Sequence, residues 1–287
     1  PTGAFVSAGV LRRDRAGLDA GFDVYDEVGP PSAGVLHDSE RRAEETVGAA
    51  LDWVRTQTKP SFLWVHLFDP HGPYDAPSPW GAGPDHHADA KGYRGEISYV
   101  DHWVGQLLDG LRAAGHDDAV VVLTSDHGEG LGEHGEATHG FLLHEATLRV
   151  PLVIVAEGVV EAGARETRHV SLIDVAPTLR RLAGFGMSDA FGGGAGLFGK
   201  ERAAAKAQYA ETLYGFESCG WAQTFATRSG HHKFVDAGSF VYEFDLATDP
   251  MELAPVRQAS VYLTPKLAEQ REMLRAFAGQ RPLASLD

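Results

Sequence analysis

The strongest chemical signal in this sequence lies in residues 120–140, VVVLTSDHGEGLGEHGEATHG. The apolar run at the start of this segment is typical of a buried strand, and Asp126 and His127 follow where that strand would end. Open α/β sheets bind their ligands beyond the carboxyl ends of the strands, where a carboxylate beside an imidazole can bind a divalent metal ion. Glycines follow the pair and would let the backbone approach a bound anion: Gly128, Gly130 and Gly132.

A second segment has the same form. Residues 62–77, FLWVHLFDPHGPYDAP, begin with an apolar run that ends at Asp69 and His71. Ten of the 14 histidines lie between His66 and His144, a denser grouping than scattered surface histidines would give. A polar loop after a core strand is the alternative interpretation of each segment. Two strand ends of this kind favour a metal site over that alternative.

The elements that would position these residues alternate between strand and helix. Apolar periodicity predicts helices over residues 38–57, 93–114 and 173–183. Short apolar runs predict strands over residues 5–10, 62–68, 119–124 and 151–156. This alternation predicts an α/β fold with a mostly parallel sheet flanked by helices. The second helix carries an apolar stripe that is interpreted as core: Ile97, Val100, Val104, Leu107, Leu108 and Leu111.

The pattern changes after residue 184. A glycine-rich stretch, 185–199, is interpreted as a flexible connector, because it lacks the lysine and the strand–helix frame of a phosphate-binding loop. Short strands without intervening helices follow, and a closing helix is predicted over 264–277; the strands are expected at 208–213, 222–228, 233–236 and 241–244. The predicted organisation is an α/β domain over 1–184, a connector over 185–205, and a small C-terminal α+β subdomain with an antiparallel sheet over 206–287.

Composition narrows the function classes. The formal net charge of −15 argues against nucleic acid and anionic membranes as partners, because both need clusters of Lys and Arg. The same charge requires a bound cation and local His or Arg if the substrate is an anion. The single cysteine, Cys219, excludes an intrachain disulfide. No apolar run approaches the roughly 20 residues that a membrane-spanning helix needs.

The chain resembles bacterial sulfatases of the alkaline phosphatase superfamily. The specific matches are the SDHGE and DPHGPY segments, supported by GLDAGFDVYDE, YRGEISYVD, THGFLLHEATLRVPLVI and YAETLYG, in family order. The resemblance implies an alkaline phosphatase-like sandwich, with a mostly parallel central sheet, and a small C-terminal antiparallel sheet. It also implies a small-molecule or glycan sulfate ester as substrate, and it favours a periplasmic or secreted protein.

Matching residue by residue, the resemblance assigns roles at both strand ends. Asp126 and His127 correspond to metal ligands, and His71 to the histidine that contacts the sulfate and protonates the leaving oxygen. His139 falls close to where many relatives place a sulfate-binding lysine. Asp69 is expected to orient an imidazole. The implied metal is Ca²⁺, with Mn²⁺ or Zn²⁺ as alternatives because an imidazole ligand suits softer ions.

Two family features are missing from the sequence. These are an N-terminal pair of metal-binding aspartates and a Cys/Ser-x-Pro-x-Arg motif, whose first residue becomes a formylglycine nucleophile; the residues after Cys219 do not fit that motif. We therefore expect an N-terminally truncated chain with an incomplete active site. The leading function is a sulfatase. The alternatives are a phosphodiesterase or phosphonate monoester hydrolase of the same superfamily, and a non-catalytic metal- or anion-binding protein.

Overall fold

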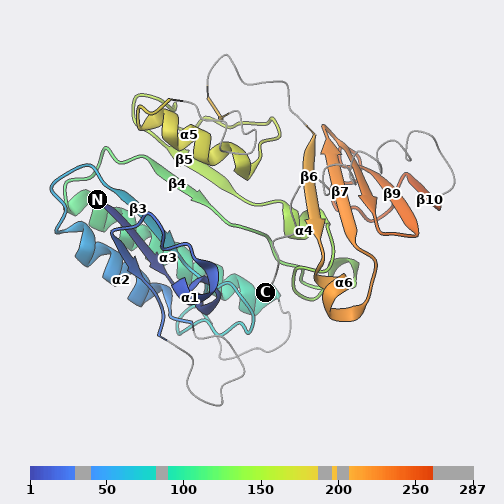
Figure 1. Cartoon of the computed structure of the whole chain (residues 1–287), viewed down its shortest axis with the longest axis horizontal. Helices are drawn as coiled ribbons and strands as arrows, with labels where there is room; N and C mark the ends of the chain where they lie inside the picture. Colours follow the sequence, from blue (N-terminus) through green and yellow to red (C-terminus); the bar gives the residue numbers. More distant parts are fainter. Residues whose placement is uncertain (30–39, 82–89, 187–195, 199–206, 261–287) are drawn as a thin grey trace. The chain divides into compact units, whose positions relative to one another are not determined.

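The computed structural model describes residues 1–29, 40–81, 90–186, 196–198 and 207–260, and Figure 1 shows their path. The chain forms two compact units. The first unit contains residues 1–122 and 154–160, and the second contains residues 123–153 and 161–287. The chain therefore passes from one unit to the other three times, and two of these crossings lie inside strands.

A three-stranded parallel sheet is the centre of the first unit. Its order is β2-β1-β3, and its strands are β1 (Thr2–Val6), β2 (Val24–Asp26) and β3 (Phe62–His66). The central strand is apolar, and its Ala4 and Val6 are fully buried. The predicted strand at 5–10 is therefore shifted toward the N-terminus, because residues 9–11 form a 3-10 turn that leads into the short helix α1 (Arg13–Ala16).

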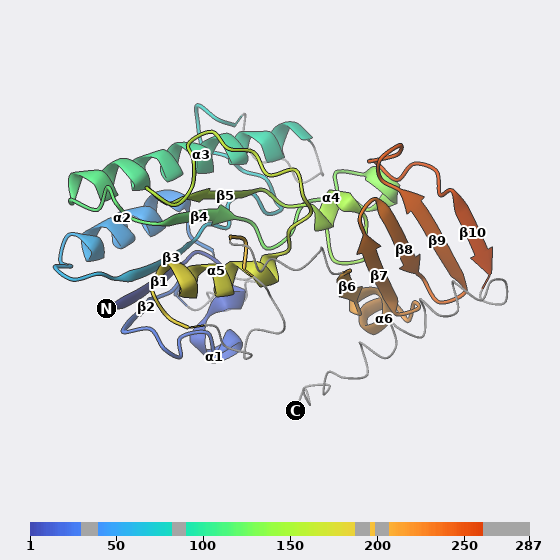
Figure 2. The ribbon, with the colours of Figure 1, turned by 90° about the horizontal axis from the view of Figure 1, so that it is seen from above.

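Helix α2 (Ala43–Val54) lies against β1 and β3, and helix α3 (Ala90–Ala113) packs on α2 (Figure 2). The apolar side chains of α2 recur at helical spacing, so Ala43, Val47 and Ala50 are all fully buried. Close packing against the sheet also needs a glycine: a Cβ at Gly3 would lie 3.0 Å from the ring of Trp53. The helices predicted at 38–57 and 93–114 are therefore present, with α2 shorter than predicted and α3 beginning three residues earlier.

The buried side of α3 differs from the predicted apolar stripe. Ile97 is 42% exposed, whereas its neighbours Glu96 and Tyr99 are 3% and 1% exposed. The rest of the stripe is partly buried. The first half of α3 therefore buries a carboxyl and a phenol, and hydrogen bonds hold both groups. A pattern that counts only apolar residues does not predict this.

Two further strands form a separate two-stranded sheet. They are β4 (Val121–Thr124) and β5 (Leu152–Val155), which match the predicted strands at 119–124 and 151–156. Between them the chain forms a 3-10 turn at Glu133–Gly135 and the short helix α4 (Glu145–Leu148). A capping box of Ser171 and Asp174 begins the turn that leads into α5 (Val175–Leu182).

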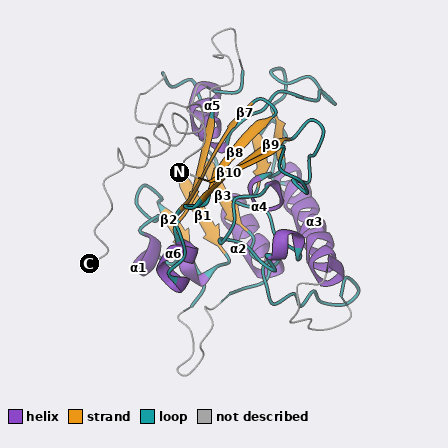
Figure 3. Ribbon diagram, turned by 90° about the vertical axis from the view of Figure 1, so that its right-hand side faces the viewer, coloured by secondary structure: helices purple, strands orange, loops and turns teal. Residues whose placement is uncertain are grey.

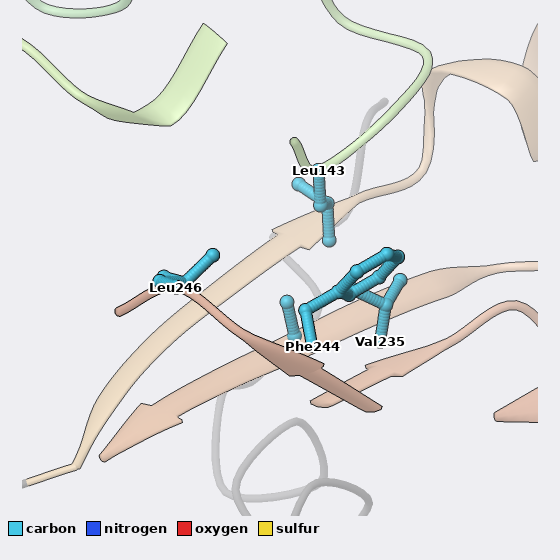
Figure 4. Packing of buried hydrophobic residues seen from close by; sticks show 5 residues of the cluster. Leu143, Val235, Phe244 and Leu246 are labelled. Carbon is cyan, nitrogen blue, oxygen red and sulfur yellow. The ribbon is translucent and has the colours of Figure 1, made fainter. Parts of the chain in front are cut away.

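The second unit contains a five-stranded antiparallel sheet of order β10-β9-β8-β7-β6, of which β7 to β10 are labelled in Figure 3. The strands are β6 (Gln208–Thr212), β7 (Thr224–Ser229), β8 (His232–Asp236), β9 (Phe240–Asp245) and β10 (Arg257–Ser260), with α6 (Tyr214–Cys219) between the first two. Leu143, from the segment after β4, packs into the core of this sheet against Val235 and Phe244 (Figure 4). The segment that carries Asp126 and His127 thus continues to Leu143, which is buried in the core of this sheet.

The α/β class, the parallel pairing and the C-terminal antiparallel sheet are confirmed. In the described residues the parallel part is a three-stranded sheet, and β4 and β5 form a sheet of their own. The predicted helix at 264–277 and most of the predicted connector at 185–205 lie outside the described residues, and the predicted domain limits stay a prediction. Among the described helices, none is long and apolar enough to cross a membrane.

Candidate functional site

Asp126 and His127 stand at the end of β4 with their donor atoms turned the same way. The Nδ1 atom of His127 lies 2.7 Å from the Gly128 carbonyl oxygen, which makes Nδ1 the protonated ring nitrogen. The other ring nitrogen, Nε2, lies 3.8 Å from Oδ2 of Asp126. The Asp126 side chain is 76% exposed and that of His127 is 42% exposed. A carboxylate and a fixed imidazole are thus both accessible to an ion from solvent.

The third residue at this strand end is His139. Its ring stacks on that of His127, with the centroids 4.0 Å apart. Its Nδ1 atom lies 3.0 Å from Oε1 of Glu129, a carboxylate whose side chain is only 3% exposed. The hydrogen bond to Glu129 raises the pKa of His139 above its ordinary 6.5, although burial opposes the change. The imidazole of His139, next to the ring of His127, therefore keeps its positive charge up to a higher pH than a free imidazole would.

Two of the glycines after His127 lie in close contact with the chain's own backbone. A Cβ at Gly128 would lie 2.2 Å from the Ala146 carbonyl oxygen, and the Gly128 N–H donates to the Thr147 carbonyl at 2.8 Å. In the same way, Gly130 donates to the Thr138 carbonyl at 2.7 Å. These contacts show that the two glycines let the loop pack against the chain's own backbone, which holds Asp126 and His127 in place.

His71 lies in the first unit, in the segment that follows β3. Its ring stacks on Phe68 with the centroids 4.2 Å apart and the planes tilted by 21°. Its Nδ1 atom lies 2.9 Å from the Gly72 carbonyl oxygen, the same arrangement as that of His127 with Gly128. The backbone carbonyl that follows each histidine therefore sets the orientation of its ring in both segments.

Asp69 caps a helix. Its two carboxylate oxygens lie 3.2 and 3.0 Å from the backbone nitrogen of Ala43, the first residue of α2. Burial raises the pKa of this carboxyl above its ordinary value. The expected role in orienting an imidazole is not among these contacts. These hydrogen bonds stabilise the start of α2, where the first backbone N–H groups have no partner within the helix.

A buried carboxyl holds the rest of the His71 segment. Oε1 of Glu96, from α3, accepts a hydrogen bond from the backbone N–H of Asp75 at 2.8 Å. Burial raises the pKa of Glu96 to about 8, so this carboxyl is largely protonated at neutral pH. The carbonyl of Asp75 also accepts a 2.7 Å hydrogen bond from Arg42. The segment after β3 is thus held by α3 and by the residue that precedes α2.

A buried charge network in the second unit was missed by the sequence analysis. Lys233, whose side chain is 1% exposed, lies 3.1 Å from Glu145 and 2.8 Å from Glu252. Arg228 completes the network at 2.6 Å from Glu145. No sequence pattern signals these contacts, since the partners are separated by up to 88 residues. The network ties α4, and with it the Gly128 segment, to the antiparallel sheet.

These features define a class of site. An exposed carboxylate and an oriented imidazole can bind a divalent ion, and a charged imidazole beside them can contact an anionic group. The donor set therefore fits a metal ion, with Asp126 and His127 as the residues that would hold it. Together, these described residues can hold a cation and an anionic group side by side.

Comparison with known proteins gives the family. The sulfatase family model matches residues 22–185, more than half of the sequence, and the chain belongs to the sulfatase family of the alkaline phosphatase superfamily. It is 32% identical over 183 residues to a choline-sulfatase of Rhizobium meliloti, covering 60% of this chain and 35% of that protein. It is 28% identical over 176 residues to arylsulfatase K of Bos taurus, covering 57% and 32% respectively. The chain thus spans about a third of the length of these two relatives.

Solved structures show the same fold at low sequence identity. A protein solved in complex with its substrate D-glucosamine-2-N,6-O-disulfate matches with a TM-score of 0.69 and 15% identity, covering 97% of this chain and 78% of that one. The phosphonate monoester hydrolase of Agrobacterium radiobacter matches with a TM-score of 0.65 and 20% identity, covering 96% and 78%. The sulfatase fold is therefore common to this chain and to enzymes named for different esters.

Proposed function

We propose that this chain is the part of a sulfatase that binds a divalent metal ion and the sulfate group of a small-molecule or glycan sulfate ester. The observation that carries the proposal is the hydrogen bond from His127 Nδ1 to Gly128, which directs Nε2 toward the side of Asp126. Metal-binding histidines commonly donate their second ring nitrogen to a carbonyl in this way. Membership of the sulfatase family supports the choice of a sulfate ester.

Asp126 and His127 are the proposed metal ligands. A bound divalent ion would supply positive charge for the sulfate oxygens and for the attacking group. Ca²⁺ is the first choice because it is the metal implied by the family, and the imidazole keeps Mn²⁺ and Zn²⁺ as alternatives. The protonated imidazole of His139, whose charge is balanced by Glu129, would offer the N–H of its other ring nitrogen to the sulfate.

His71 is the proposed acid for the leaving group. Cleavage of a sulfate ester leaves an alkoxide or phenoxide oxygen that needs a proton, and an imidazole can provide it near neutral pH. The contacts with Gly72 and Phe68 restrain the ring of His71, as such a role requires. Since poor leaving groups depend most on the proton, the effect of losing His71 should vary with the leaving group.

The proposal places the nucleophile outside these 287 residues. No position of the sequence fits Cys/Ser-x-Pro-x-Arg, and Cys219 is followed by Gly-Trp-Ala-Gln. In the complete protein the nucleophile would be a formylglycine or a related residue that attacks sulfur. Taken alone, the 287-residue chain is expected to bind metal and to show negligible turnover.

The test uses the product of the complete gene. Its intact mass would be about 18 Da below that of the sequence if a cysteine has become formylglycine. Turnover of 4-nitrophenyl sulfate would then support the proposal, and His71→Ala should reduce turnover of an alkyl sulfate more than that of the aryl ester. A complete gene product without the motif and without sulfatase turnover would overturn it in favour of a non-catalytic metal- or anion-binding protein.

A second candidate is the hydrolysis of phosphonate monoesters or phosphodiesters. The observation that favours it is His127, because an imidazole ligand suits ions softer than Ca²⁺. The same gene product separates the two candidates. A higher kcat/KM for 4-nitrophenyl phenylphosphonate than for 4-nitrophenyl sulfate, with bound Mn²⁺ or Zn²⁺, would select the second candidate.

A further inference from the structure

A cluster of two histidines and a glutamate lies in the second unit, separate from Asp126 and His127. Its members are His134, from the 3-10 turn after β4, His144, at the start of α4, and Glu252, from the segment before β10. The ligand atoms that these side chains offer all lie within 4.8 Å of one another. Nothing in the proposed sulfatase chemistry uses them.

The backbone takes an unusual conformation at two members of this cluster. Among the described residues, His134 and Glu252 are the only non-glycine residues with a positive φ, at 57° and 54°. This left-handed conformation is unfavourable for residues with a Cβ and is held only where the surrounding structure requires it. The fold therefore maintains both residues in a strained conformation at the place where their side chains meet.

The orientation of the side chains suits a metal ion. The rings of His134 and His144 stack with their centroids 3.6 Å apart, and His144 Nδ1 lies 3.3 Å from Oε2 of Glu252. The two oxygens of the Glu252 carboxylate have different partners. Oε1 lies 2.8 Å from Lys233, and Oε2 accepts a hydrogen bond from the backbone N–H of Glu145. Because a carboxylate oxygen has a second acceptor position, Oε2 can also bind an ion beside the imidazoles.

The protonation states agree with this arrangement. Burial, followed by the charge of His144, lowers the pKa of His134, so its imidazole is neutral at neutral pH, the form that binds metals. Burial by itself would raise the pKa of Glu252, but the hydrogen bond with His144 and the charge of Lys233 bring it down to about 2. His134 also forms a hydrogen bond with the backbone of Met251, the kind of partner that orients metal-binding histidines.

We propose that His134, His144 and Glu252 form a second metal site, which binds Zn²⁺. Two imidazoles and one carboxylate are a common zinc ligand set that leaves a fourth position for water. Zinc bonds of about 2.0 Å place tetrahedral ligand atoms roughly 3.3 Å apart. Binding would draw the ligand atoms together from their present spacing, with His134, the exposed member, moving most. The ion would join the loop after β4 to α4 and to the segment before β10.

The test uses the 287-residue chain with Asp126→Ala, so that the pair at the end of β4 does not contribute. After treatment with a chelator, this protein is titrated with Zn²⁺ alone by calorimetry, and Co²⁺ absorption reports the coordination geometry. We expect one Zn²⁺ per chain and an intense visible Co²⁺ spectrum. His134→Asn, which tolerates a positive φ, and His144→Gln should each weaken Zn²⁺ binding by at least about tenfold.

The matched control is His232→Ala. The His232 side chain is 60% exposed and lies 3.7 Å from Glu243. In the described structure, no third metal-ligating side chain joins this pair. It should leave Zn²⁺ binding unchanged. The proposal is overturned if the Asp126→Ala chain binds no Zn²⁺ at micromolar concentrations. It is equally overturned if His134→Asn and His144→Gln, with melting transitions like that of the parent, bind Zn²⁺ as tightly as the parent does.

Discussion

The segments after β3 and β4 start from similar residues and use them differently. Asp69 precedes His71 after β3, and Asp126 precedes His127 after β4. The Asp69 carboxylate is bound to the first N–H of α2, whereas the Asp126 side chain is 76% exposed. Each histidine is oriented by the carbonyl of the next residue. The two imidazoles are thus oriented in the same way, but only Asp126 has a carboxylate that an ion can reach from solvent.

The largest expected effect comes from the exposed aspartate. In the complete protein, Asp126→Ala should abolish specific uptake of the divalent ion by the pair and lower kcat/KM at least about 100-fold. The free energy of unfolding should change by less than about 0.5 kcal/mol, because the side chain is mostly in solvent. Metal analysis and steady-state kinetics check this. The control is Asp117→Ala, which replaces an exposed aspartate before β4. If Asp126→Ala takes up the ion as the parent does, Asp126 is not a metal ligand.

The partly buried aspartate, Asp69, should behave in the opposite way. Asp69→Ala removes the acceptor for the first N–H of α2 and should lower the free energy of unfolding by about 1–2 kcal/mol. Asp69→Asn keeps an acceptor oxygen and should recover part of that loss. Urea unfolding of the 287-residue chain measures both variants. If Asp69→Ala left stability intact and instead lowered metal uptake, the distinction between the two aspartates would be wrong.

The smallest effect concerns the pH range of activity. Glu129 raises the pKa of His139, so the protonated imidazole is fully present below its ordinary pKa of 6.5 and is lost as the pH rises through the higher, folded-state pKa. If that charge binds the sulfate, kcat/KM of the complete enzyme falls on the alkaline side. Glu129→Gln removes the largest cause of the raised pKa and should move this fall to lower pH.

A pH–rate profile of the Glu129→Gln variant measures the shift. Glu133→Gln, in the same loop, serves as the control, because Glu133 accepts a hydrogen bond from the backbone of Leu131 and is not a partner of His139 in the described contacts. An alkaline limb that stays in place in Glu129→Gln would mean that His139 does not carry the charge that binds the substrate.

The sequence predicted the strands that end at the site, because local patterns specify them. Apolar runs mark β3 and β4, and polar residues follow each run at once. The three-residue strand β2 was not predicted, since a segment that short has no periodicity to detect. The same patterns also placed Ile97 in the core of α3, where Glu96 and Tyr99 are buried in its stead.

The surroundings of the candidate residues could not be predicted, because they depend on contacts between distant parts of the chain. The pairing of Glu129 with His139, ten residues apart, follows from how the loop folds back. Lys233 and Glu252 come from the C-terminal sheet and its continuation, more than 85 residues after Glu145. Sequence motifs thus pointed to the candidate groups at the strand ends, and the structure supplied the buried groups that hold them.

The close packing at Gly128 has a consequence for how this family can diverge. Any side chain at residue 128 would collide with the backbone at Ala146, and the Thr147 carbonyl accepts the Gly128 N–H. The two segments are 18 residues apart in the sequence, yet a change in the backbone of one displaces the other. They should therefore be inherited together, and a chain in which an Asp-His-Gly triplet lacks its matching α4 segment is a poor candidate for the same site.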